Sequence, residues 1–207
     1  MSSTSKMKWK AEQTQNPLIN QEGLWNAALE AFATQSFREA SLNEIIRKAG
    51  MNKGSFYYRF YDKLDLYLSL MERMAVEKLA LISAQNIQGM GADFFEDFRN
   101  LALVSLRFAQ KEQRYLGLWR KYMAEEEEIK RQLREEFGGM SQNAIHAMIE
   151  MSKAQGKIRK ETSTVLVASI ITALLDSIDQ VIDPESSEEE ILAEIDNLID
   201  LLKHGIQ

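Results

Sequence analysis

The chain contains no cysteine among its 207 residues, and it has only two prolines and two histidines. The lack of cysteine excludes disulfide bonds, thiolate zinc sites and cysteine nucleophiles, and it fits a reducing compartment. Alternating β-branched runs bounded by turns are missing too. Ala, Leu, Glu, Lys, Met and Gln, which favour helices, dominate the composition. We therefore expect an all-α fold.

Long apolar segments are also lacking. The most apolar run, Val165 to Leu175, spans eleven residues, whereas a membrane-spanning helix needs about 20. The first ten residues, MSSTSKMKWK, have no apolar core of the kind found in signal peptides. We therefore expect a soluble, cytoplasmic protein with no membrane partner.

Signatures of catalysis are missing as well. The two histidines, His146 and His204, belong to no recognisable metal-ligand or nucleophile pattern. The chain has no P-loop and no G-x-G-x-x-G motif. We expect no catalytic residue, no metal and no cofactor, so an enzyme is the weaker hypothesis.

The charge is distributed unevenly. Residues 1–63 carry nine Lys or Arg against six Asp or Glu, while residues 64–207 carry sixteen against twenty-five, within a net charge of −6. Overall acidity by itself points away from nucleic acid. A local basic face is nevertheless enough to hold phosphates, and the positive part of the chain also carries the motif described next.

Residues 41–63, SLNEIIRKAGMNKGSFYYRFYDK, have the pattern of two short capped helices. Ser41 followed three residues later by Glu44 forms a capping box. Gly50 suits the left-handed backbone of a tight turn, and Asn52 suits the start of a second helix. Two capped helices around a glycine turn predict a helix-turn-helix, which lays its second helix in the major groove of DNA.

Helical periodicity extends through most of the remaining chain. Residues 1–16 are polar and expected to be loose. The alternative is that Lys6, Lys8, Trp9 and Lys10 form an arm that touches DNA. Gly138 and Gly139 are expected to separate two helices, and Gly156 to end the second. The predicted helices cover residues 20–34, 42–49, 53–60, 63–85, 92–110, a stretch around 116–123, 125–137, 140–155, 164–182 and a last one that Ser186 or Ser187 caps.

The last two predicted helices carry more apolar surface than one core face requires. The surplus can pack on a second copy as a four-helix dimer interface, or it can close on the chain's own core. We favour the homodimer. The residues predicted to form its interface are Ile171, Leu174, Ile178, Ile191, Ile195, Leu198 and Leu202.

The region from Leu24 to Leu70 resembles the tetracycline-repressor-like (TetR/AcrR) family of transcription regulators. Two positions depart from the family pattern, because Ser36 replaces a usual glycine and Ile46 a usual small residue. The resemblance implies about nine helices, with a DNA-binding head over 1–62 and a ligand-binding and dimerisation body over 63–207. The residues that carry it are Ala27-Ala28, Phe32, Ile45, Ala49-Gly50, Lys53-Gly54-Ser55, Tyr57-Tyr58, Phe60 and Lys63.

The second motif helix is the one expected to read DNA. The Arg59 guanidinium fits a guanine edge, and Lys53 and Lys63 are expected to hold phosphates. The tyrosines can bind phosphates or thymine methyl groups, or they can pack in the core, and Arg59 can be a solvated surface residue. The predicted DNA-binding set is Ser41, Lys53, Ser55, Tyr57, Tyr58, Arg59 and Lys63.

These features predict a regulator, most simply a repressor, that leaves a palindromic double-stranded operator when a small, largely apolar effector binds in the body. The alternative is a ligand-independent regulator whose body only pairs subunits. Each candidate for the pocket lining can equally be plain core. The candidates are Met71, Met74, Phe98, Leu101, Trp119 and Tyr122.

Overall fold

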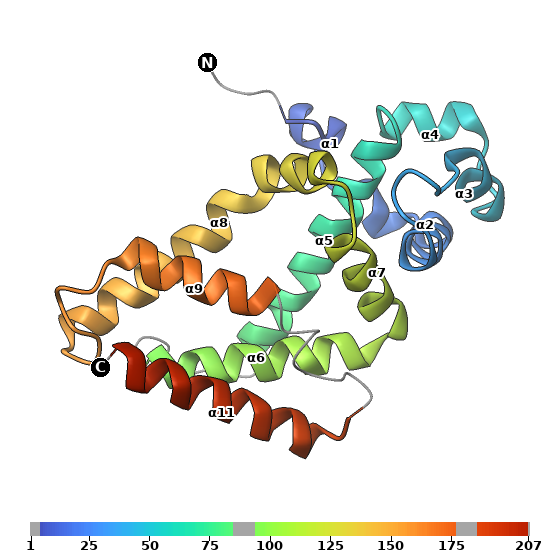
Figure 1. Cartoon of the computed structure of the whole chain (residues 1–207). Helices are drawn as coiled ribbons and strands as arrows, with labels where there is room; N and C mark the ends of the chain where they lie inside the picture. Colours follow the sequence, from blue (N-terminus) through green and yellow to red (C-terminus); the bar gives the residue numbers. More distant parts are fainter. Residues whose placement is uncertain (1–4, 85–93, 177–185, 207) are drawn as a thin grey trace. The chain divides into compact units, whose positions relative to one another are not determined.

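The structure is a computed structural model that describes residues 5–84, 94–176 and 186–206. Within these ranges the regular elements are all helical and no strand occurs, as expected (Figure 1). None of the helices in the described ranges has the length and apolarity needed to cross a membrane. In chain order the elements are α1 (Lys8–Ala11), the 3-10 turn η1 (Pro17–Asn20), α2 (Glu22–Thr34), α3 (Leu42–Lys48), α4 (Lys53–Arg59), α5 (Lys63–Ala84), α6 (Phe94–Lys111), α7 (Gln113–Met123), α8 (Glu127–Ala154), α9 (Thr164–Asp176) and α11 (Glu188–Ile206).

The chain packs as two compact units. The first unit combines Met1–Leu81 with Phe108–Glu136, and the second combines Ile82–Arg107 with Phe137–Gln207. This division reflects only which residues pack together. The boundary between residues 62 and 63 was predicted for function, as the limit between DNA binding and ligand binding, and it stays a prediction.

The core of the first unit is built around α2. Six apolar residues of this helix are buried, including Trp25 and Phe32. The Phe32 ring lies 4.8 Å from the ring of Tyr67 on α5. Because α3 and α4 have only seven residues each, they are too short to be stable in isolation and depend on this core. Figure 1 shows α2, α3 and α4 grouped together in this unit.

Helix α7 packs closely on α2. A Cβ atom added at Gly117 would lie 2.9 Å from the carbonyl oxygen of Ala33, so no larger residue fits without a shift. Arg114 reinforces the contact, because its Nη2 donates to Asn26 Oδ1 at 3.0 Å. The two helices therefore meet almost backbone to backbone.

The core of the second unit is formed by α6, α8, α9 and α11. Phe94 and Phe98 of α6 pack in one buried cluster with Ile191 and Ile195 of α11, and α6 and α11 lie side by side in Figure 1. An ion pair joins the same two helices, with Arg99 Nε and Nη2 at 2.5 and 2.9 Å from the carboxylate of Asp196.

Two local expectations are wrong. Helix α8 runs without a break from Glu127 to Ala154, so Gly138 and Gly139 do not end it. Glycine costs about 1 kcal/mol relative to alanine inside a helix, and a long helix tolerates that cost. Residues 5–16 are not loose either, because Met7 is fully buried and Asn16 is buried as well.

Two helix boundaries are confirmed. Gly156 follows the end of α8 with a φ of +75°, the left-handed conformation that glycine adopts most easily. At the start of α11, Ser187 Oγ accepts from the Glu190 amide at 3.3 Å, and the Ser187 amide donates to Glu190 Oε2 at 2.9 Å. This is a reciprocal capping box, formed by one of the two serines expected to cap the helix.

Candidate DNA-binding site

The helix-turn-helix forms as predicted and is capped at both helix starts. Ser41 Oγ accepts from the Glu44 amide at 3.4 Å, and Asn52 Oδ1 accepts from the Ser55 amide at 2.8 Å. Gly50 has a φ of +63°, which glycine tolerates best. The capping box at α3 is only half formed, because the Glu44 carboxylate pairs with Arg47 at 2.6 Å instead.

One face of α4 is buried and holds the helix in place. Phe56 and Phe60 are fully buried and stack with ring centroids 5.2 Å apart. Ile45 and Ile46 of α3 are buried as well, so the isoleucine at the helix crossing is accommodated in the core. The two phenylalanines, four positions apart, therefore point inward.

The opposite face of α4 carries the two tyrosines. Tyr57 is 50% exposed and Tyr58 is 76% exposed, so neither packs in the core. Lys53, at the start of the helix, and Ser41 are exposed, and Ser55 is partly buried. This face therefore presents phenol rings and hydroxyl groups to solvent together with a lysine.

Arg59 lies along its own helix in the free protein. Its Nη1 donates to the carbonyl oxygen of Ser55 at 2.8 Å, and its guanidinium carbon lies 5.7 Å from the centre of the Tyr58 ring. A guanidinium that reads a base must give up this internal hydrogen bond. The side chain is partly buried and sits beside the exposed tyrosines.

Lys63 is committed to contacts within the protein. Its Nζ donates to the carbonyl oxygens of Arg38 at 3.3 Å and Ala40 at 2.8 Å, and it lies 4.6 Å from the centre of the Phe37 ring. Burial lowers the pKa of this ammonium group. Two of its three N–H donors therefore hold the segment before α3, which leaves one for a phosphate.

Two further residues shape this site: Lys8, which the sequence suggested only as part of an arm that touches DNA, and Asp65, which sequence reasoning missed. Lys8 Nζ donates to the carbonyl oxygens of Tyr57 at 3.0 Å and Tyr58 at 2.9 Å. Asp65, which is fully buried, accepts from the amides of Tyr61 at 2.8 Å and Lys8 at 3.1 Å. Burial raises the pKa of the Asp65 carboxyl, although these hydrogen bonds act in the opposite direction. No local pattern signals the contacts of Lys8 with α4 and with Asp65, because they join residues 49 to 57 positions apart.

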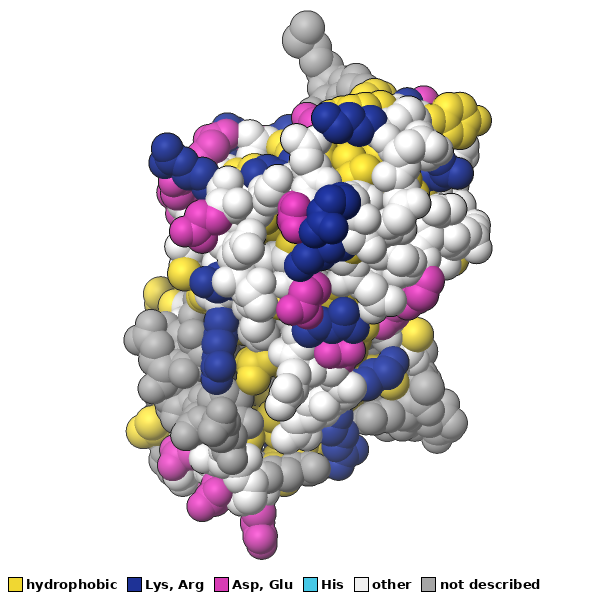
Figure 2. Space-filling view, turned by 90° about the vertical axis from the view of Figure 1, so that its right-hand side faces the viewer, with side chains coloured by type: hydrophobic (Ala, Val, Ile, Leu, Met, Phe, Trp, Pro, Cys, Tyr) yellow, Lys and Arg dark blue, Asp and Glu magenta, His cyan; other side chains and the backbone are white. Residues whose placement is uncertain are grey.

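Figure 2 shows how charge is arranged on one face of the molecule. Lys and Arg side chains lie singly on this face and are interspersed with Asp and Glu side chains. A broad field of one sign is absent from the part of this face that the structure describes. Phosphate attraction on this face must therefore come from individual side chains and helix ends.

The six candidate pocket residues are divided between the two units. Met71 and Met74 of α5 and Trp119 and Tyr122 of α7 are partly buried in the first unit, where the rings of Trp119 and Tyr122 lie 5.5 Å apart. Phe98 is buried and Leu101 partly buried in the second unit.

Two hollows lie on the surface of the first unit. A hollow of about 710 Å³ lies between the amino-terminal segment and α5, and another of about 330 Å³ lies between α2 and α3. Neither is lined by any of the six candidate pocket residues. Among the described residues, no group of three or more His, Asp or Glu is placed to hold a metal ion.

The predicted interface residues differ in how much surface they offer. Ile171, Ile191 and Ile195 lie in the core of their own chain, each at most 2% exposed, which leaves them little surface for a partner. Leu198 is partly buried. The side chains of Leu174, Ile178 and Leu202 lie outside the described part of the chain. Exposed aliphatic side chains do occur on the same helices: Val165, Leu166 and Ile170 on α9 and Leu201 on α11.

The head matches a known protein family. Residues 24–70 match the family model described as bacterial regulatory proteins, tetR family. The chain is similar to the HTH-type transcriptional regulator SrpR of Pseudomonas putida, with 36% identity over 62 residues. That match covers 30% of this chain and 26% of SrpR, so it spans about a quarter of that relative.

Solved structures share the fold over nearly the whole chain. A TetR family transcriptional regulator from Chloroflexus aurantiacus aligns with a TM-score of 0.68 and 22% identity, over 92% of this chain and 94% of that one. The regulator FadR from Bacillus subtilis, solved in complex with stearoyl-CoA, aligns with a TM-score of 0.70 and 18% identity, over 90% and 99% of the two chains. The motif, its caps and these matches together show that residues 24–70 carry the helix-turn-helix of the tetR family and that the chain has the fold of TetR family regulators.

Proposed function

We propose that the protein is a homodimeric repressor that binds a palindromic double-stranded operator through α4 and releases it when a small, largely apolar molecule binds in the helical body. The observation that carries the DNA-binding part is the division of α4 into two faces. Phe56 and Phe60 anchor one face, and Tyr57 and Tyr58 are exposed on the other. A short helix anchored in this way suits insertion into a major groove.

The contacts with DNA are assigned by chemistry and exposure. Tyr57 and Tyr58 donate hydroxyl groups to phosphates or lay their rings against thymine methyl groups, and Lys53 and Ser41 bind phosphates. Arg59 exchanges its bond to the Ser55 carbonyl for a bidentate contact with guanine. Lys63 has a smaller part than the sequence suggested, because most of its donors are used internally.

A second copy of the chain is the proposed partner for the exposed aliphatic residues of α9 and α11. Val165 is 64% exposed, Leu166 56% and Leu201 75%. Aliphatic groups gain most from a dry contact, and a two-fold dimer buries the same surface of both copies. The two α4 helices would then enter successive major grooves about 34 Å apart.

The effector is proposed to act through α7. Trp119 and Tyr122, two of the candidate lining residues, lie on the same helix as Gly117, and Gly117 leaves no free space against Ala33 of α2. A displacement of α7 therefore passes to α2, on which α3 of the motif packs. The structural likeness to a FadR solved with stearoyl-CoA supports a ligand in the body.

The test begins with a DNA duplex that the wild-type protein selects from a randomised pool. Small apolar compounds are then screened for those that raise the melting temperature, since a ligand of the folded state stabilises it. A true effector should weaken binding to the selected duplex by about 5- to 150-fold, and the duplex should weaken effector binding by the same factor. Trp119→Ala should retain DNA binding and lose the response.

Two results would contradict this proposal in different ways. If the wild-type protein enriches no duplex, the DNA-binding role is wrong. If a compound binds tightly and affinity for the selected duplex does not change, the body is not an effector switch. The ligand-independent regulator is then the better interpretation.

A further inference from the structure

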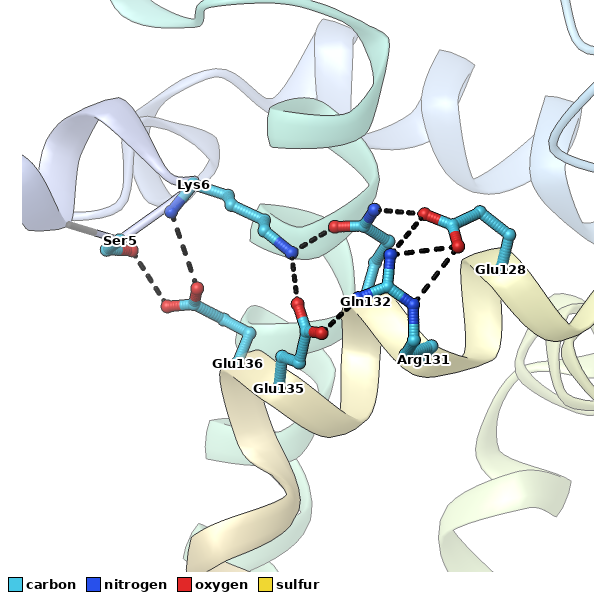
Figure 3. Close-up of polar contacts among 7 residues, drawn as sticks. All are labelled: Ser5, Lys6, Glu128, Arg131, Gln132, Glu135 and Glu136. Atoms are coloured by element: carbon cyan, nitrogen blue, oxygen red, sulfur yellow. Dashed lines mark hydrogen bonds and ion pairs between the residues drawn. The ribbon is translucent and has the colours of Figure 1, made fainter. Parts of the chain in front are cut away.

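The amino-terminal segment Ser5–Ala11, which we call the clasp, contacts two elements that lie far from it in the sequence. One is the carboxyl-terminal end of α4, the proposed reading helix. The other is the part of α8 that belongs to the first unit, residues 127–136. Figure 3 shows the second of these contacts.

The contact with α8 consists of several polar bonds. Ser5 Oγ donates to Glu136 Oε1 at 2.8 Å, and Lys6 Nζ pairs with Glu135 Oε2 at 2.6 Å and also bonds to Gln132. In Figure 3 the polar network continues along α8 from Glu135 through Arg131 to Glu128. Lys10 adds a further ion pair, 3.6 Å from Glu136 Oε1.

The hydrogen bonds to α4 come from Lys8. Lys8 Nζ donates to the carbonyl oxygens of Tyr57 and Tyr58 at 3.0 and 2.9 Å. The last carbonyls of a helix lack intrahelical partners and form the negative end of its dipole. A lysine there stabilises the final turn, which is the turn that carries both exposed tyrosines and Arg59.

Buried contacts hold the clasp firmly between these two ends. Met7, which separates Lys6 from Lys8, is fully buried. The Lys8 amide donates to Asp65 Oδ2 at 3.1 Å, and Trp9 Nε1 donates to Ser69 Oγ at 2.9 Å. Exposed ion pairs alone contribute little. An anchored segment of this kind, however, cannot shift at Lys6 without also moving Lys8.

From these contacts we infer that Lys8 is a positioning residue for α4. We also infer that the clasp couples α4 to α8, so that losing the contact with α8 loosens the last turn of α4. The consequence for DNA reading rests on the proposed function. The positioning itself is a property of the free protein and is tested without DNA. Lys8 acts from behind α4 in this inference, and it does not bind a phosphate.

The first experiment measures amide hydrogen exchange on α4 in the full-length protein. Lys8→Met keeps the aliphatic stem and removes the ammonium, and it should speed exchange at residues 57–60 by about tenfold, the value of one charge-assisted hydrogen bond. Lys8→Arg should restore slow exchange. The matched control is Lys111→Met, at an exposed lysine outside the clasp, and it should leave α4 unchanged. Unchanged exchange in Lys8→Met would overturn the positioning role.

The link to α8 is tested with a pair of glutamates on that helix. Glu136→Ala removes the acceptor of Ser5 and of the Lys6 amide, and it should speed exchange at residues 57–60 by about threefold, a smaller effect because the contact is indirect. Glu127→Ala alters the same helix outside the clasp contacts and should have no effect on α4. Equal exchange in the two variants would overturn the link.

DNA binding then distinguishes a positioning residue from a phosphate contact. Lys8→Met should weaken binding to the selected duplex about tenfold more than binding to a scrambled duplex, with the salt dependence unchanged. A phosphate contact would instead weaken both duplexes equally and reduce the salt slope by about 0.9, which would overturn the inference. If the wild-type protein binds no duplex, the proposed function fails, and the exchange data still decide the inference.

Discussion

Helices α4 and α9 both expose large apolar side chains, but the chemistry of the exposed groups differs. On α4 the exposed groups are phenols, with Tyr57 50% and Tyr58 76% accessible. On α9 they are aliphatic, with Val165 64% and Leu166 56% accessible. A phenol can pack its ring and still give its hydroxyl a polar partner, whereas an aliphatic group gains only from excluding water. The first surface therefore suits a hydrated polyanion, and the second suits another protein surface.

Both helices are anchored by the face opposite the exposed one. Phe56 and Phe60 bury the inner face of α4, and Val167 and Ile171 bury that of α9. Substitutions on the exposed faces should therefore change binding and leave the fold intact. This separation makes the difference between the two surfaces testable with single side chains.

The largest effect is expected on α9 and α11. Leu166→Glu combined with Leu201→Glu would place charge in the proposed seam between subunits, and it should raise the dimer dissociation constant by about 100-fold, because an unpaired charge is costly to desolvate. Analytical ultracentrifugation over a concentration series measures this constant. Ala154→Glu, at an exposed position of the same unit, is the control. A wild-type protein that is monomeric at micromolar concentration would refute the dimer.

A smaller effect is expected at Arg59. Arg59→Ala should cost about 1–3 kcal/mol on the selected duplex and relax the preference at one base position, because the guanidinium fork reads guanine. Arg47→Ala serves as the control, since that guanidinium is already paired with Glu44 on the protein surface. Fluorescence anisotropy with selected and scrambled duplexes gives both affinities. Equal losses on the two duplexes would make Arg59 a phosphate contact.

The role of the phenol groups is tested by Tyr58→Phe. This change removes one hydroxyl and keeps the ring, and it should cost about 1 kcal/mol on both the selected and the scrambled duplex if the hydroxyl binds a phosphate. The same titrations measure it. If the phenylalanine variant binds both duplexes as well as wild type, the Tyr58 ring and not its hydroxyl contacts DNA. The hydroxyl would then not distinguish the exposed face of α4 from that of α9.

The smallest change in affinity is expected at the lysines. Lys53→Ala should reduce the slope of log K against log salt by about 0.9, the value for one neutralised phosphate. Lys63→Ala should change the slope less, because two of its three donors already bind the carbonyls of Arg38 and Ala40. Titrations at several salt concentrations measure both slopes. Equal reductions would show that Lys63 leaves its internal contacts on binding DNA.

Several features of the head could be predicted because their causes are local. Ser41 and Asn52 cap amides three residues ahead, and Gly50 supplies one positive φ. Such contacts depend on a few neighbouring residues and survive in any fold that contains the motif. The inward face of α4 was predictable for the same reason, because Phe56 and Phe60 lie one helical turn apart.

Features that depend on distant residues could not be predicted in this way. Gly138 and Gly139 remain inside α8, which runs from Glu127 to Ala154, because a helix of that length tolerates the cost of two glycines. The polar composition of the clasp suggested disorder, yet Met7 is buried. Lys63 has the sequence position of a phosphate contact, and its bond to Ala40 depends on how the chain folds back over 23 positions.

The sequence by itself determined the helical class, the motif and its caps, because these follow from backbone preferences and hydrogen bonds within a turn of helix. The tertiary structure decided which apolar residues of α9 and α11 are left exposed, and it decided that Lys8 caps α4. Burial depends on what other parts of the chain cover a side chain, and a charged group binds whichever partner the fold brings to it. Ile171 and Leu166 are equally apolar in the sequence, and only the packing places one in the core and the other in solvent.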